Sequence, residues 1–250
     1  MAKAKSPSIE ESWSRINQWL RSQRKAASLA KKLLPGVPEE ALERVEKGVG
    51  VRLPDDLRQF WQLCGGSRPG KGAEETDDEP WWQPGEWSSD FFPRSIPETM
   101  AFSILSPRAA LEAWERLQEW EGFDRRWLPI AGDGGGDYQS VNLATKSSAH
   151  HGKVVEWSHE GEDSTVLAPS LSSFLQQLAD GLERGTISYQ RENGLVHVRP
   201  TAVEQMPKVL PSSAQIQKLL KMKVATCPVC GRGMQGVVMG LHLERAHGIR

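Results

Sequence analysis

The sequence predicts an α+β fold in which helices cover a single, mostly antiparallel sheet, with a small additional element at the C-terminal end. Apolar residues recur at helical spacing through the N-terminal part of the chain. Strand-like segments with alternating apolar and polar residues then flank a glycine-rich turn at residues 133–137. Because helical stretches separate the remaining strand-like segments, we expect one helix-covered sheet over residues 8–200.

Helices are expected first along the chain. Residues 8–34 predict an amphipathic helix that begins with a capping box at Ser8 and has a candidate break near residues 22–25. Pro38 is expected to start a shorter helix, with Gly48 as its stop. Proline suits the first helical position because its missing N–H would have no helical partner there.

A third helix and the first strand are predicted next. The helix begins at Pro54, and we interpret Cys64 near its end as a buried, apolar thiol. Residues 101–105 predict a strand. The helix that follows runs to about residue 120 and starts at Ser106, whose side chain can cap its first free N–H groups.

The segment 65–93 combines acidic and aromatic side chains. Its stretch 74–90 carries seven acidic residues and no basic one. Disordered segments are normally poor in aromatic residues, so the rings either fold back onto the core or form an exposed protein-binding loop. In the second case Trp81, Trp82 and Trp87 would contact the partner, because tryptophan is enriched among the residues that anchor interfaces.

The centre of the predicted sheet is a meander of strands at 127–131, 138–143 and 153–157. Three successive glycines between the first two strands predict a tight turn, because glycine loses too much backbone entropy inside a helix or strand. Glycines also let backbone N–H groups approach a phosphate, but Asp133 and Asp137 would repel one. We therefore expect a hairpin, with these two aspartates as candidate partner-binding residues.

The remaining elements complete the predicted domain. A strand is expected at 164–167, then a helix at 170–184 with Gly185 just past its end, then a hairpin over 187–198. Residues 201–213 contain two prolines and few apolar residues, and they predict a linker.

Five short motifs, in a fixed order, carry a resemblance to a known family; they lie at residues 53–66, 105–107, 128–137, 152–159 and 171–175. Together they resemble the SUKH superfamily, which contains the fungal cell-wall assembly regulators of the SMI/KNR type and many bacterial toxin-immunity proteins. The resemblance covers about residues 10–184. It implies an α+β binding module without catalytic residues.

The charge is distributed unevenly. Residues 1–34 carry eight Lys or Arg against two Glu, and residues 204–250 carry seven against two. Since the whole chain has a net charge of −1, the part between them carries −12. Such an acidic part disfavours a nucleic-acid surface and suits either a basic protein partner or solubility alone.

The composition predicts a cytoplasmic protein that does not cross a membrane. No run of 18 or more apolar residues is present, and the first residues lack the apolar segment of a secretory signal. The chain has three cysteines, of which two are spaced as metal ligands, and this pattern suits a reducing compartment.

The tail, residues 214–250, begins with a predicted basic helix at 214–223 and ends in a Cys-x2-Cys-x11-His-x4-His pattern. Two thiolates and two imidazoles form the tetrahedral donor set that structural zinc prefers. The candidate ligands are Cys227, Cys230, His242 and His247. The tail thus resembles a two-cysteine two-histidine zinc finger with a spacer one residue shorter than usual; an unstructured tail is the alternative.

Two functions remain open on the sequence. The first is an immunity protein that occludes a basic toxin, such as a nuclease; the second is a regulatory adaptor whose zinc finger tethers it to nucleic acid or to a complex. Nucleic acid is expected to bind only through the basic tail. His150, His151 and His159 lie near acidic residues, but no nucleophile or phosphate-loop motif accompanies them, so we expect no enzyme activity.

Overall fold

The computed structural model describes residues 8–68, 91–96, 99–160 and 164–198, and the backbone of 225–226 and 233–234. The chain divides into two compact units, Met1–Val198 and Arg199–Arg250. The predicted linker at 201–213 and the predicted basic helix at 214–223 lie outside the described residues.

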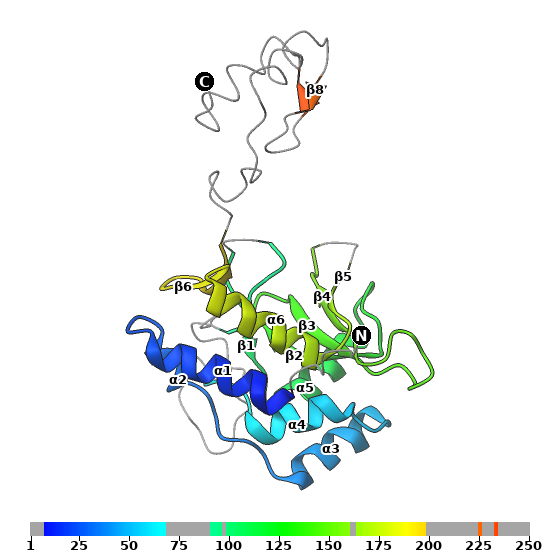
Figure 1. Cartoon of the computed structure of the whole chain (residues 1–250). Coiled ribbons are helices and arrows are strands. Elements are labelled where there is room, and N and C mark those ends of the chain that lie inside the picture. Colours follow the sequence, from blue (N-terminus) through cyan, green and yellow to red (C-terminus); the bar gives the residue numbers. More distant parts are fainter. Residues whose placement is uncertain are drawn as a thin grey trace, which may run out of the picture. The chain divides into compact units, whose positions relative to one another are not determined.

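Five strands form one antiparallel sheet in which the spatial order follows the order along the chain (Figure 1). The strands are β1 (Ser103–Ile104), β2 (Trp127–Gly132), β3 (Tyr138–Asn142), β4 (Val154–Trp157) and β5 (Thr165–Ala168). Helix α5 (Pro107–Leu117) connects β1 to β2. The predicted α+β class and the central meander are therefore confirmed.

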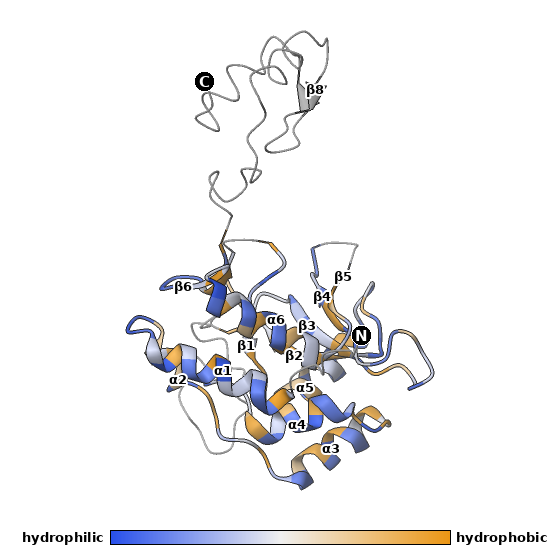
Figure 2. Cartoon of the chain, in the orientation of Figure 1, coloured by the Kyte–Doolittle hydropathy of each residue, from blue (hydrophilic) through white to orange (hydrophobic). Residues whose placement is uncertain are grey.

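Helices precede and follow the sheet. They are α1 (Ile9–Ser22), α2 (Ala27–Ala30), α3 (Glu39–Val49), α4 (Asp55–Leu63) and α6 (Leu171–Arg184). The candidate break after residue 22 is present, since α1 and α2 are separate helices. Figure 2 shows apolar and hydrophilic sides on α1, α3 and α4, as expected of helices that cover a core.

The main core is built around a row of aromatic rings from distant parts of the chain. Trp13 of α1 meets Phe60 of α4 edge to face at 5.2 Å between ring centroids. Phe92 lies 6.1 Å from Phe60 and 5.1 Å from Phe174 of α6. Phe91 and Phe92 directly follow the acidic stretch 74–90 and are both buried, so the C-terminal end of the segment 65–93 is fixed in the core.

The second face of the sheet packs against α5. Tyr138 and Trp157 are register partners on β3 and β4, and they join Ala113 and Leu117 of α5 in a smaller apolar cluster. Neighbouring residues on a strand point to opposite faces, so Val141 contributes to the main core instead. With both faces covered, all five residues of β3 are buried.

The predicted serine caps are confirmed, whereas Pro38 and Pro54 are the N-cap residues of α3 and α4 and not their first helical residues. The side chains of Ser8, Ser106 and Ser170 cap α1, α5 and α6. Gly48, however, does not end α3; the helix continues to Val49 and ends at Gly50, whose φ is +74°. Gly48 lies against α5, and a Cβ there would lie 2.7 Å from the end of the Leu111 side chain, which would have to move to make room for it.

Polar contacts between helices set the position of α6. The carboxylate of Asp56, in the first turn of α4, accepts hydrogen bonds from the backbone N–H groups of Leu171 at 2.9 Å and Ser172 at 3.2 Å. Arg15 of α1 donates to Asp180 at 2.7 Å and to Glu183 at 2.8 Å. The N-terminus of α6 is therefore capped by another helix, and its last turns are tied to α1.

A hairpin follows α6. The strands β6 (Ile187–Gln190) and β7 (Gly194–His197) pair with each other as a separate two-stranded sheet. In the second unit, β8 (Ala225–Thr226) pairs with β9 (Gly233–Met234) in antiparallel register. Among the described residues, no helix combines the length and the apolar character that a membrane crossing requires.

We predict that Phe60→Ala lowers the free energy of unfolding by about 3–5 kcal/mol, because it removes a fully buried ring and leaves a cavity between its aromatic neighbours. Urea unfolding followed by circular dichroism measures the change. Leu63→Ala, on the exposed end of the same helix, is the control and should cost less than about 1 kcal/mol. Equal losses for the two variants would contradict the assignment of Phe60 to the core.

Candidate partner-binding site

The glycine-rich turn at 133–137 is stabilised by its own first residue. The Oδ1 atom of Asp133 accepts from the backbone N–H of Gly135 at 2.8 Å and of Asp137 at 3.0 Å. Gly134 and Gly136 have positive φ values of 79° and 116°, which side chains disfavour. The hairpin prediction is confirmed, and two of the N–H groups that a phosphate would require already have a carboxylate partner.

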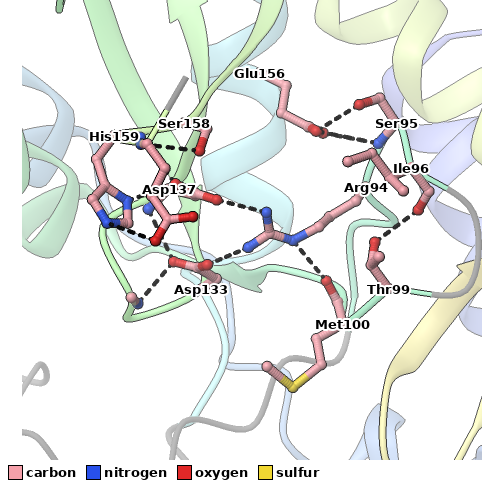
Figure 3. Close-up of polar contacts among 12 residues, drawn as sticks. Arg94, Ser95, Ile96, Thr99, Met100, Asp133, Asp137, Glu156, Ser158 and His159 are labelled. Atoms are coloured by element: carbon pink, nitrogen blue, oxygen red, sulfur yellow. Dashed lines mark hydrogen bonds and ion pairs between the residues drawn. The ribbon is translucent and has the colours of Figure 1, made fainter. Parts of the chain in front are cut away.

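Arg94 lies at the centre of the polar network beneath this turn (Figure 3). Its guanidinium donates to Asp133 and, at 2.7 Å, to Asp137. It also donates to the carbonyl oxygen of Met100 at 3.0 Å, and it lies 4.5 Å from the centroid of the Phe102 ring. Burial alone would lower the pKa of Arg94, but its two aspartates raise it, so the group stays charged.

The two predicted aspartates are internal partners of Arg94. Their side chains are 10% and 11% exposed, against 15% for Arg94. Each ion of this triad is thus removed from water and compensated by the others, which is the condition for a buried ion pair to be tolerated. A role of Asp133 and Asp137 in contacting a partner stays a prediction; their role in the structure is to fix the turn.

Asp137 also holds the chain that follows β4. Its Oδ1 atom accepts from the backbone N–H of His159 at 3.0 Å and lies 2.9 Å from Nδ1 of the same residue. Burial by itself raises the pKa of Asp137, but the hydrogen bonds from Arg94, His159 and Ser158 outweigh it and lower the pKa to about 2. Both carboxylate oxygens are thereby engaged, so Asp137 orients the imidazole.

Glu156 fastens the segment that contains Arg94 to the sheet. Its carboxylate accepts from the backbone N–H of Ser95 at 3.0 Å and from the Ser95 hydroxyl at 2.7 Å (Figure 3). It also accepts from the side-chain amide of Gln139 at 3.0 Å. Gln139 also donates to the carbonyl oxygen of Pro93 at 2.9 Å. Residues 93–95 are therefore tied to both β3 and β4.

Sequence reasoning missed Arg94 and Glu156. The sequence offered one signal for Arg94, which is the first basic residue after the acidic stretch 74–90. The partners of Arg94, however, lie 39 and 43 positions further along the chain, and no local pattern connects them. The other predicted site residues, Trp81, Trp82, Trp87, Cys227, Cys230, His242 and His247, lie outside the described residues.

An exposed tryptophan lies next to this network. Trp120 is 45% exposed, and its ring stands edge-on to His159 and to Trp157, at 6.1 Å between centroids in each case. The flanking residues Glu119 and Glu121 are exposed, as is Glu160, whose side chain is 84% accessible. We call Glu119, Trp120, Glu121, His159 and Glu160 the Trp120 surface; it joins one large aromatic ring to three carboxylates.

The three histidines considered for acid–base chemistry have different surroundings. His159 bonds to Asp137, whereas Nδ1 of His151 lies 2.6 Å from the carbonyl oxygen of Ala144. His150 is an exposed loop residue whose backbone N–H bonds to Ser148. Within the described part of the chain, no group of three or more His, Cys, Asp or Glu side chains is arranged to hold a metal ion.

The fold and the site together define a class of protein. In this class, helices cover an antiparallel meander, and an internal ion-pair network forms its polar centre. The family model described as the SMI1/KNR4 family (SUKH-1) matches residues 36–177, more than half of the chain. The chain therefore belongs to the SMI1/KNR4 family. This family includes cell-wall glucan synthesis regulators and immunity proteins.

A curated relative agrees with this assignment. The protein described as "Glucan synthesis regulatory protein" from Neurospora crassa is 23% identical over 210 residues, which cover 71% of this chain and 39% of the relative. The match thus spans well under half of that relative's length.

We predict that stability falls as the pH drops from about 4 to about 2, because the folded-state pKa of Asp137 is near 2 and the ordinary value is 3.8. A carboxylate with a lowered pKa contributes stability above its unfolded-state pKa and loses it as the pH falls through the folded-state value. Asp137→Asn should therefore cost about 2 kcal/mol at pH 7 and progressively less below pH 4.

Urea unfolding at several pH values between 7 and 3 tests this. The control is Glu43→Gln, which neutralises an exposed carboxylate on α3 and should leave the pH profile unchanged. A constant difference between wild type and Asp137→Asn across this range would show that the ion-pair network does not depend on the Asp137 charge.

Proposed function

We propose that this chain is a non-catalytic protein-binding module that uses the Trp120 surface to bind a basic protein. The observation that supports this most directly is that the exposed indole of Trp120 packs against side chains that hold it in a fixed position. The rings of Trp157 and His159 support Trp120, and His159 is in turn fixed by Asp137. A tryptophan in a fixed position loses little conformational entropy on binding, which is why such residues anchor interfaces.

Charge determines which partner this surface suits. Glu119 and Glu121 are exposed and flank Trp120 in the chain, and Glu160 is exposed next to His159, so these carboxylates favour a partner that presents Lys or Arg. An acidic rim accelerates the encounter, while the buried part of the tryptophan contact slows dissociation. In the immunity version of this proposal the partner is a basic toxin, such as a nuclease, and the module inhibits it by covering its active surface.

A regulatory adaptor is the second candidate, and the fungal relative favours it. That protein is named as a regulator of glucan synthesis, and its alignment covers most of this chain. In this version the module binds a component of a regulatory complex, and the C-terminal tail supplies a second contact. The two versions differ in the tail: an inhibitor should act without residues 204–250, whereas an adaptor should fail without them.

We also propose that the tail binds one structural zinc ion through Cys227, Cys230, His242 and His247. The spacing of these residues supports it, and so does the backbone around the first two. Residues 225–226 pair with 233–234, so the chain reverses direction across the interval that contains both cysteines. A Cys-x2-Cys knuckle requires such a reversal for both thiolates to reach one metal.

For the partner surface, we expect Trp120→Ala to weaken binding at least tenfold while leaving the thermal unfolding midpoint within a few degrees of the wild type, since the ring is half exposed. Quantitative affinity capture from nuclease-treated lysate of the host, with mass spectrometry, provides the measurement. Val166→Ala, a comparably exposed apolar residue at 54%, is the matched control and should retain the same basic protein. Equal capture by the two variants would exclude this surface.

For the tail, we expect about one zinc ion per purified chain by mass spectrometry of the metal content. The variant that combines Cys227→Ser and Cys230→Ser should lose it, because two oxygen donors replace the two thiolates. Cys64→Ala is the control, since this buried thiol has a pKa raised to about 12 by burial and lies outside the ligand set. Full zinc content in the double variant would rule out the proposed ligands.

A further inference from the structure

A groove with a basic lining lies between the α1–α2 break and the β6–β7 hairpin. Its volume is about 660 Å³, and it is lined by Arg24, Lys25, Ser28, Tyr189, Gln190 and Arg191. In Figure 1 the blue loop after α1 and the yellow hairpin at β6 lie on the same side of the first unit. Three of the six lining residues are cations, in a unit whose sequence is acidic over most of its length.

The two walls of the groove are held in fixed positions. Arg15 ties α1 to α6 through Asp180 and Glu183, and α6 leads through Gly185 directly into β6. On the opposite wall, Ala26 lies within the break and is fully buried, so Arg24 and Lys25 are attached to an anchored backbone. The groove is therefore formed before any ligand arrives.

The cations of this groove are not among the arginines that form ion pairs in the described part of the chain. The ion pairs of the described residues involve Arg15, Arg52, Arg58, Arg94, Arg108, Arg126 and Arg184. Arg24, Lys25 and Arg191 appear in none of the ion pairs or side-chain hydrogen bonds given by that part of the structure. Three like charges around one groove repel each other, and a bound anion removes that repulsion.

We propose that this groove is a binding site for a phosphate monoester. A phosphate group carries nearly two negative charges at neutral pH and three acceptor oxygens, whereas a carboxylate carries one charge and is satisfied by a single arginine. Arg24 and Arg191 can approach it from opposite walls with paired N–H donors, and Tyr189 and Ser28 add hydroxyl donors.

The shape of the site selects among phosphate-bearing ligands. A membrane surface is flat and cannot enter a groove between a helix break and a hairpin tip. A nucleic acid presents a row of phosphates and rewards a longer stripe of cations than the three found here. The geometry therefore suits a single phosphate group on a small molecule or on a modified side chain.

This site is independent of the proposed partner surface. Its residues lie at 24–28 and 189–191, whereas the Trp120 surface lies on the segments around residues 120 and 160. The match to the SMI1/KNR4 family model covers residues 36–177 and includes none of the groove residues. The groove is thus formed by parts of the chain outside the matched family segment.

The test is a titration of the full chain with phenyl phosphate, followed by two-dimensional amide NMR, with benzoate as the carboxylate counterpart. We expect phenyl phosphate to cause saturable chemical-shift changes that are confined to the groove residues, and added salt should weaken this binding. Benzoate should bind with at least tenfold lower affinity. Combining Arg24→Gln with Arg191→Gln should weaken phenyl phosphate binding at least tenfold. Arg44→Gln combined with Arg125→Gln is the control, because it removes the same charge from exposed positions elsewhere.

The outcomes separate clearly. Loss of binding in the groove variant but not in the control supports the site. Equal binding by both variants, or equal binding of benzoate and phenyl phosphate, overturns it and leaves a diffuse attraction between anions and surface cations. Within a positive result, a phosphoserine peptide that binds more tightly than inorganic phosphate identifies a modified protein as the source, and equal affinities identify a small phosphate compound.

Discussion

The ion pairs of Arg94 with Asp133 and Asp137 are the constraint on which the polar side of this fold depends. They join the segment after the acidic stretch to the turn between β2 and β3. Because all three side chains are largely buried, removing Arg94 would leave two buried carboxylates without their shared cation. The turn, the ring of His159 and the position of Trp120 follow from this arrangement, since each contacts the next.

The same network holds the surface around Trp120 in a fixed position. The glycines of the turn accept backbone angles that other residues disfavour, and a Cβ at Gly136 would lie 3.0 Å from Nδ1 of His159. The turn therefore packs directly against the imidazole that supports Trp120. A surface fixed in this way before binding loses less entropy when a partner orders it further.

The first unit presents two polar surfaces of opposite character. Exposed glutamates flank Trp120 in the chain, whereas the groove at Arg24 and Arg191 is lined by cations. The net charge of −1 reveals neither of them. The two proposed sites use different residues, so binding of a basic protein and binding of a phosphate group can be tested separately.

Capping residues and apolar periodicity were enough to predict the helices and the central hairpin, because these signals act within a few positions of the chain. The tertiary structure alone showed that Gly48 lies against Leu111, that Arg94 joins two distant aspartates and that Trp120 stays exposed. It also brought Arg24 and Arg191 to one groove. Each of these features depends on contacts between segments far apart in the chain, and a local sequence pattern does not show which distant side chains meet.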